Sequence, residues 1–223
     1  MSESHTSLGT AIQRHSVRLG AFAFGCAVLL AFAYFYTKDR IAFQKQEAER
    51  QSLNQILPAA MHDNDLLQAS FKLTPLTSDF QQLELLGLST ARTAYRASLQ
   101  EAPSGVILPL ETAEGYSGTI VLVIGIDKDG VITGVRVLQH AETPGLGDKI
   151  DIRLSPWITS FDHRDLKETP EPLWRVKKDG GDFDQFVGAT ITPRAVVGAV
   201  HKALLFFEMN KDKLLQLPPR TQP

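Results

Sequence analysis

The stretch TIVLVIGIDKDGVITGVRVLQH, residues 119–140, decides the fold. Two apolar, β-branched runs at residues 119–127 and 131–140 flank Asp-Lys-Asp-Gly, a sequence typical of a tight turn. This pattern predicts a β-hairpin. Two more apolar runs precede it, TAYRASL at residues 93–99 and GVILPLE at residues 105–111. The sequence therefore predicts an antiparallel sheet.

A long helix is predicted after the sheet. Thr192 is a favourable N-cap residue, and Pro193 suits the first helical position. Apolar residues then recur at helical spacing and indicate a buried face: Val196, Val200, Leu204 and Phe207. The expected fold class is α+β, an antiparallel sheet with flanking helices behind an N-terminal helix.

Several shorter elements are predicted between these. A short helix is expected near residues 65–71, another around Trp157, and a further strand at residues 173–178. Trp157 and Trp174 are interpreted as core side chains because large aromatic residues most often fill a protein interior.

An uncharged run, LGAFAFGCAVLLAFAYFY at residues 19–36, is long enough to cross a bilayer as one helix. A cleaved signal peptide is the competing interpretation, but its apolar region is shorter and is followed by small residues. Here three aromatic residues, Tyr34, Phe35 and Tyr36, end the run and favour a membrane anchor. Basic residues on both sides of the run leave its orientation open.

The expected organisation has four parts. Residues 1–18 form an N-terminal segment, residues 19–36 the transmembrane helix, residues 37–57 a helical stalk, and residues 58–223 a folded domain. Cys26 lies within the span and is interpreted as a lipid-facing or helix-facing residue.

Composition excludes several functions. The formal net charge is −2 without a block of Lys or Arg, so nucleic-acid binding is not expected. A single cysteine excludes an internal disulfide, a CxxC pair and a cluster ligated by this chain alone. The six histidines show no metal-ligand spacing, so no metal site is predicted. Redox chemistry would require an organic cofactor or a haem.

The segment DGGDFDQFVGATITPR, residues 179–194, places Thr190 just before the predicted helix. Backbone amides and the helix dipole favour an anion there, so a phosphate on or beside Thr190 would be held. Gly188 and Ala189 leave room for a bulky group. The residues alone nevertheless favour a plain capped turn, because capped helix starts are commoner than anion sites.

Three separated stretches behind the single span carry a resemblance: residues 114–125 (EGYSGTIVLVIG), 140–150 (HAETPGLGDKI) and 179–197 (DGGDFDQFVGATITPRAVV). Together they resemble the G subunit of the Rnf (Rsx) ion-translocating electron-transport complex. The wider family is the FMN-binding domain shared with the C subunit of the sodium-pumping NADH:quinone oxidoreductase.

The resemblance implies a single-pass protein of the bacterial inner membrane, with residues 1–18 in the cytoplasm and the folded domain in the periplasm. It implies an electron-carrier subunit of an oxidoreductase (translocase) complex. No complete active site of its own is expected, and no catalytic residue is assigned. The expected partners are other membrane subunits, surrounding lipid and, during maturation, a flavin transferase.

The resemblance also implies covalent FMN. A transferase would join the FMN phosphate to the hydroxyl of Thr190, and Asp184 would be its acidic recognition residue. Val187 stands where the family usually carries Ser or Thr, so one hydrogen bond is missing and slower attachment is expected. Thr192 is the next-best acceptor, although its predicted capping role opposes this.

The resemblance assigns further residues to cofactor binding: Gly188, Ala189, Thr192, Glu142, Thr143, Gly145, Leu146 and Gly147. Leu146 would cover a face of the flavin ring between two glycines. From the residues alone, the same loop is an ordinary strand-to-helix connection. Asp148, Lys177 and Lys178 are either site charges or solvated surface charges.

Two other functions stay open. The first is a flavin-free assembly or regulatory subunit that keeps the fold. The second is a sensor domain that binds flavin without a covalent bond and signals through its stalk helix.

Overall fold

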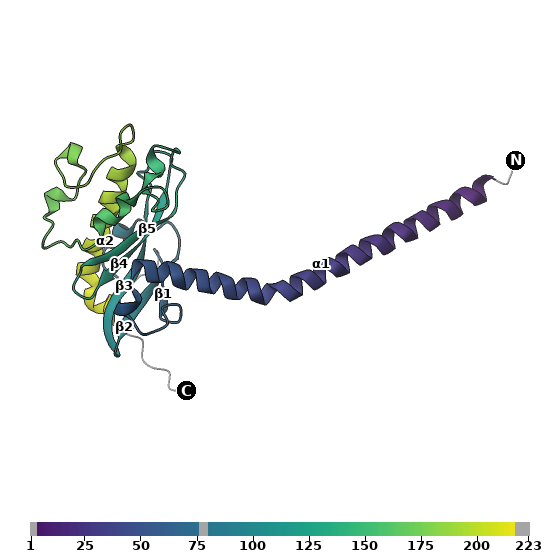
Figure 1. Ribbon diagram of the computed structural model, residues 1–223, viewed down its shortest axis with the longest axis horizontal. Helices are drawn as coiled ribbons and strands as arrows, with labels where there is room; N and C mark the ends of the chain where they lie inside the picture. The colour runs from purple at the N-terminus through teal and green to yellow at the C-terminus, as the bar shows by residue number, and fades with distance from the viewer. Residues whose placement is uncertain (1–3, 76–79, 217–223) are drawn as a thin grey trace. The chain divides into compact units, whose positions relative to one another are not determined.

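The computed structural model describes residues 4–75 and 80–216. Its internal contacts divide the chain into two compact units, Met1–Glu49 and Arg50–Pro223. The first unit consists of most of helix α1, Ser4–Ile56 (Figure 1). Within α1, the stretch Arg18–Lys38 has a mean hydropathy of 1.9 and is long and apolar enough to cross a membrane.

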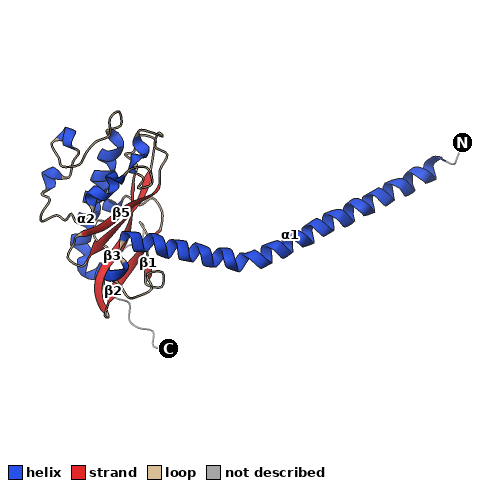
Figure 2. Ribbon diagram, viewed as in Figure 1, coloured by secondary structure: helices blue, strands red, loops and turns tan. Residues whose placement is uncertain are grey.

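The second unit contains a five-stranded antiparallel sheet in which each strand pairs with the next along the chain (Figure 2). Its strands are β1 Ser70–Leu73, β2 Arg92–Leu99, β3 Ala102–Thr112, β4 Ile120–Asp127 and β5 Ile132–Gln139. The predicted hairpin is β4 and β5. Asp127 stabilises its turn, because its Oδ1 accepts hydrogen bonds from the backbone N–H groups of Asp129 (2.8 Å) and Val131 (2.9 Å).

The remaining elements are helical. Helix α2, Ile191–Leu215, follows the last loop and covers one face of the sheet (Figure 1). Short 3₁₀ helices occupy Ala59–Met61, Leu83–Leu86, Gly147–Ile150, Pro156–Phe161, Glu171–Leu173 and Lys177–Asp179. The predicted α+β class is confirmed, and the short helix around Trp157 is present as a 3₁₀ helix.

Both faces of the sheet are covered because β3 and β4 are apolar on both sides. In β4, Leu122, Ile124 and Ile126 lie in the cluster that includes the buried side of α2. Their neighbour Val123 lies in a second cluster on the opposite face, as alternation along a strand requires. The predicted core residues Trp157 and Trp174 are both buried in the α2-side cluster.

The last turns of α1, from Arg50 onward, cover that opposite face. Leu53 and Ile56 are buried there, as is Leu57 directly after the helix. The carbonyl oxygen of Ile56 accepts a hydrogen bond from the hydroxyl of Thr133 on β5 at 2.7 Å. The sheet thus satisfies one of the carbonyl groups that a helix end leaves unpaired.

Two of the shorter predicted elements are wrong. Residues 173–178 form no strand: Val176 makes a single parallel bridge to Phe183, and 3₁₀ turns lie on either side of it. The bridge is isolated, and Gly180 in a left-handed conformation (φ 85°) lies in the turn between its two residues. Residues 65–71 form no helix, because one turn at Asp65 leads directly into β1 and its pairing with β2.

Gly125 gives the end of α1 space to approach the sheet, and Gly125→Ala should destabilise the domain. An added Cβ would lie 2.8 Å from the carbonyl oxygen of Ile56 and 2.4 Å from the hydroxyl of Thr133. We expect a loss of about 1–3 kcal/mol in the free energy of unfolding, measured by urea denaturation. Gly198→Ala on α2 is the matched control. It has no heavy atom within 4 Å of the added Cβ and should stabilise by about 0.5–1 kcal/mol. Equal effects of both variants would contradict this account.

Candidate functional site

A cavity of about 290 Å³ lies where the loop after β5 meets the start of α2. Its walls come from three separate segments of the domain. The lining residues are Tyr116, Glu142, Thr143, Leu146, Gly147, Gly188, Ala189, Thr190, Ile191 and Thr192. Apart from Tyr116 and Ile191, every one of them is a site residue predicted from the sequence. The volume lies near the lower end of the range for small-molecule sites.

A tight turn presents Thr190 to this cavity. The carbonyl oxygen of Phe186 accepts a hydrogen bond from the N–H of Ala189 at 3.2 Å, and Gly188 adopts φ 81°. Positive φ at the third turn position favours glycine, so the Val-Gly order has a conformational reason. Phe186 anchors the turn to the core, because its ring packs edge-on against that of Trp157 with the ring centroids 5.1 Å apart. Val187 at the turn apex is 92% exposed.

Thr190 occupies the N-cap position of α2. Its side chain makes no capping hydrogen bond. Its carbonyl oxygen accepts the first bond of the helix, from the N–H of Arg194 at 3.2 Å. Thr190 therefore lines the cavity directly before the first turn of α2, whose backbone N–H groups carry the positive end of the helix dipole.

The prediction that Thr192 caps α2 is wrong. The helix begins at Ile191, and Thr192 is fully buried. Its hydroxyl instead donates a short hydrogen bond to Oε2 of Glu142. The other carboxylate oxygen of Glu142 accepts from the backbone N–H of Ser117 at 3.0 Å. Glu142 is only 4% exposed, so one buried carboxylate joins the loops containing residues 117 and 142 to α2.

Two glycines give this carboxylate its space. A Cβ at Gly147 would lie 2.7 Å from Oε2 of Glu142 and 2.7 Å from the hydroxyl of Thr192. A Cβ at Gly115 would lie 2.8 Å from Oε1 of Glu142. Any larger residue at either position would displace the carboxylate.

Two predicted residues, Gly145 and Asp184, do not line the cavity. Gly145 lies on the same loop in a left-handed conformation (φ 77°). Asp184 lies on the surface, where its Oδ1 is 2.7 Å from Nζ of Lys177. Hydrogen bonding to Asp184 raises the pKa of Lys177. Lys177 therefore pairs with the acidic residue and does not line the cavity.

The other candidate charges also lie outside the cavity. Lys178 donates its backbone N–H to Oε1 of Gln185 at 3.2 Å. Oδ1 of Asp148 is buried and has no hydrogen-bond partner among the described residues. Asp179 pairs with Arg194, and hydrogen bonds from this guanidinium lower the pKa of Asp179.

Two residues that line the cavity, Tyr116 and Ile191, are not predicted from the sequence. Tyr116 lies in the loop between β3 and β4, and the available signal was an aromatic residue between two glycines, Gly115 and Gly118. Ile191 directly follows Thr190, so its position at the cavity depends on where α2 begins. Helix starts are difficult to place from sequence within one or two residues.

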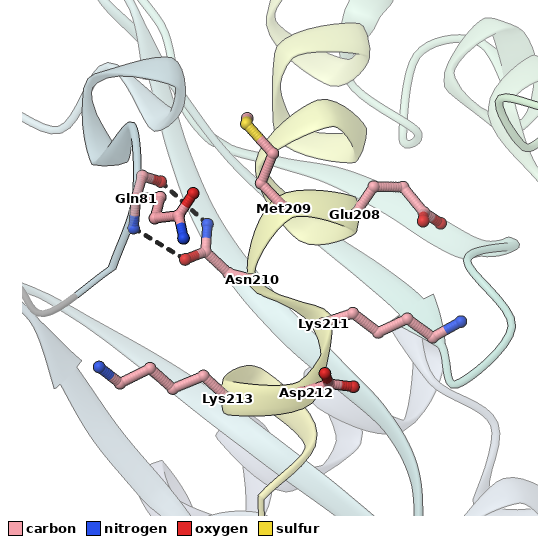
Figure 3. A pocket seen from close by; sticks show the side chains of 7 residues that line it. All are labelled: Gln81, Glu208, Met209, Asn210, Lys211, Asp212 and Lys213. Atoms are coloured by element: carbon pink, nitrogen blue, oxygen red, sulfur yellow. Dashed lines mark hydrogen bonds between the residues drawn. The ribbon is translucent and has the colours of Figure 1, made fainter.

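A larger hollow of about 370 Å³ lies at the C-terminal end of α2 (Figure 3). Its one buried polar side chain, Asn210, binds the backbone of Gln81 through both amide atoms, at 2.8 and 2.9 Å. Glu208 and Lys211 point away from Asn210 (Figure 3). The polar groups of this hollow hold the chain together and do not converge on a common point.

Comparison with known proteins defines the class first. Residues 115–205 match the FMN-binding domain family, and residues 1–56 match the RnfG N-terminal region. The chain is 43% identical over 209 residues to the G subunit of the ion-translocating oxidoreductase complex of Aliivibrio fischeri (strain MJ11), covering 94% of this chain and 96% of the relative.

A second relative gives the same result. The chain is 45% identical over 204 residues to the G subunit of the ion-translocating oxidoreductase complex of Pseudomonas aeruginosa (strain UCBPP-PA14), covering 91% of each chain. This chain therefore belongs to the RnfG family of ion-translocating oxidoreductase complex subunits and carries an FMN-binding domain. Membership in a complex implies other subunits as partners.

The Glu142–Thr192 bond should contribute measurably to stability. Thr192→Val keeps the shape of the buried side chain but removes the donor, leaving one carboxylate oxygen of Glu142 without its bond. We expect a loss of about 1–3 kcal/mol in the free energy of unfolding, measured by urea denaturation. Thr192→Ser retains the hydroxyl and should lose less. If serine and valine destabilise equally, packing and not the hydrogen bond is responsible.

Proposed function

We propose that this chain is a membrane-anchored electron carrier, with FMN joined through its phosphate to the hydroxyl of Thr190. The observation that carries the proposal is the position of Thr190. Its side chain makes no capping bond, and the residue lines the cavity at the N-cap position of α2. A phosphate attached there would meet unpaired N–H groups and the positive end of the dipole.

The cavity fits a flavin in its chemistry. Apolar or aromatic side chains at Tyr116, Leu146 and Ile191 offer contact to the faces of a flat ring. The hydroxyl group of Thr143 is available to its polar edge. Gly188 leaves space in the cavity beside Leu146, because a Cβ at position 188 would lie 3.4 Å from Cδ2 of Leu146.

The protein contributes position and surroundings. FMN supplies the capacity to accept and donate electrons when bound. The turn at residues 186–189 holds the acceptor residue, Glu142 fixes the two loops against α2, and Leu146 closes one side. No side chain among the described residues is hydrogen-bonded to the Thr190 hydroxyl, so its activation is assigned to a flavin transferase that recognises Asp184.

The membrane placement completes the proposal. The apolar stretch Arg18–Lys38 supports one transmembrane helix in the bacterial inner membrane. The domain would lie in the periplasm, where a covalent bond prevents loss of the cofactor. Anchor and tether together keep the flavin at high effective concentration near the partner subunits.

Flavin attachment in Thr190 variants tests this proposal. The chain is produced in a host with a flavin transferase, separated by denaturing electrophoresis and viewed under ultraviolet light. Wild type should show a flavin band and an FMN adduct on the peptide containing Thr190. Thr190→Ala should show neither, while Thr190→Ser should retain attachment because it keeps a hydroxyl. Neither variant should change the free energy of unfolding by more than about 0.5 kcal/mol.

The same experiment separates the other functions. A Thr190→Ala protein that stays yellow until it is denatured would indicate a flavin sensor without a covalent bond. A wild-type chain without flavin, from a host that flavinylates a control protein, would indicate a flavin-free assembly subunit. A fluorescent band that remains in Thr190→Ala would show that flavin is attached at another residue, and Thr192 is the first one to check.

Position 187 should control the rate of attachment. Val187 is 92% exposed, so a hydroxyl there would face the modifying enzyme and not the core. Val187→Thr should accelerate flavinylation by roughly fivefold, the equivalent of one added hydrogen bond of about 1 kcal/mol. The measurement is the time course of the fluorescent band with purified transferase. Val187→Ala is the control and should not accelerate attachment; equal rates for threonine and valine would exclude this role.

A further inference from the structure

Tyr116 is the one aromatic side chain that lines the cavity, and it is 69% exposed. It lies at the tip of the loop that joins β3 to β4, so it approaches the cavity from a different segment than Leu146 and Ile191. An exposed phenol ring at a cavity wall can cover a flat group that enters the cavity.

The loop that carries Tyr116 is held mainly by one hydrogen bond to a buried carboxylate. The backbone N–H of Ser117 donates to Oε1 of Glu142 at 3.0 Å. Nζ of Lys202 on α2 lies 3.7 Å from Oε1 of Glu114. The loop also closes tightly on itself, since a Cβ at Gly115 would lie 2.3 Å from the carbonyl oxygen of Gly118. Tyr116 is therefore exposed on a fixed support.

Glu142 links this support to the acceptor. Its second oxygen binds Thr192, two residues beyond Thr190. The position of the Tyr116 loop is thus coupled through one carboxylate to the start of the helix that carries the attachment residue.

We infer that Tyr116 packs its ring against the isoalloxazine as the outer wall of the cavity, and that Glu142 is the positioning residue that keeps it there. This inference rests on the proposed attachment at Thr190. Leu146 and Ile191 supply aliphatic contacts, and Tyr116 supplies the aromatic one.

Fluorescence provides the test, because a phenol in contact with a flavin ring quenches its emission. The excited ring takes an electron from the phenol and then returns it, so the ground states are unchanged. Wild type and variants are flavinylated in the same host and compared at equal flavin absorbance, first folded and then denatured. Wild-type emission should rise several-fold on denaturation.

Tyr116→Phe should raise the emission of the folded protein several-fold, because phenylalanine does not donate the electron. Tyr116→Ala should in addition raise quenching by iodide, because the ring loses its outer cover. Glu142→Gln, which loses one of two acceptor oxygens, should give emission between wild type and Tyr116→Phe. Tyr95→Phe is the matched control: Tyr95 lies on β2 and packs against the cluster on the opposite face of the sheet, so its loss should change neither signal.

The flavin band on a denaturing gel distinguishes the possible failures. If the band is normal in every variant while neither emission nor iodide quenching changes in the Tyr116 variants, the inference is overturned and the attachment proposal stands. Tyr116 would then be a contact for a partner protein of the complex. If wild type has no band, both proposals fail.

Discussion

The buried carboxylate of Glu142 is the interaction on which the site depends. It accepts one hydrogen bond from the loop before β4 and one from the first turn of α2, while its own backbone belongs to the loop after β5. Burying a carboxylate is costly unless its oxygens are bonded, so these segments keep a fixed arrangement or the domain loses stability. Gly115 and Gly147 are required because side chains there would overlap this carboxylate.

The sheet makes that arrangement possible. Strands β3 and β4 are apolar on both faces, so one face holds α2 and the other holds the end of α1. Helix α2, which follows Thr190, is therefore fixed along its buried side. Its first turn is bonded through Thr192 to Glu142, which also joins the two loops. Trp157 adds to this support, because its Nε1 donates a hydrogen bond to the carbonyl oxygen of Asp184 at 2.7 Å, in the segment before Thr190.

The sequence predicted what depends on local pattern. The β-branched runs around residues 119–140 specify the β4–β5 hairpin because alternation and a turn are both local properties. Thr192 was misinterpreted because its partner, Glu142, is 50 residues away, and a buried partner outweighed a capping preference. The segment 173–178 has a strand-like composition, but 3₁₀ turns on both sides of Val176 limit it to one bridge. Tyr116 became a cavity residue only through the packing of distant loops.

A covalent cofactor is consistent with the shape of the cavity. At about 290 Å³, with Tyr116 and Leu146 still exposed, it covers a flat ring only in part. Partial cover gives little area for non-covalent affinity, yet it leaves a ring edge accessible for electron exchange with a partner. The phosphoester proposed at Thr190 would resolve this conflict, because a tethered group is held at high effective concentration whatever its intrinsic affinity. The proposed covalent bond at the helix start and the open wall of the cavity would then act together, because they would retain the cofactor without enclosing it.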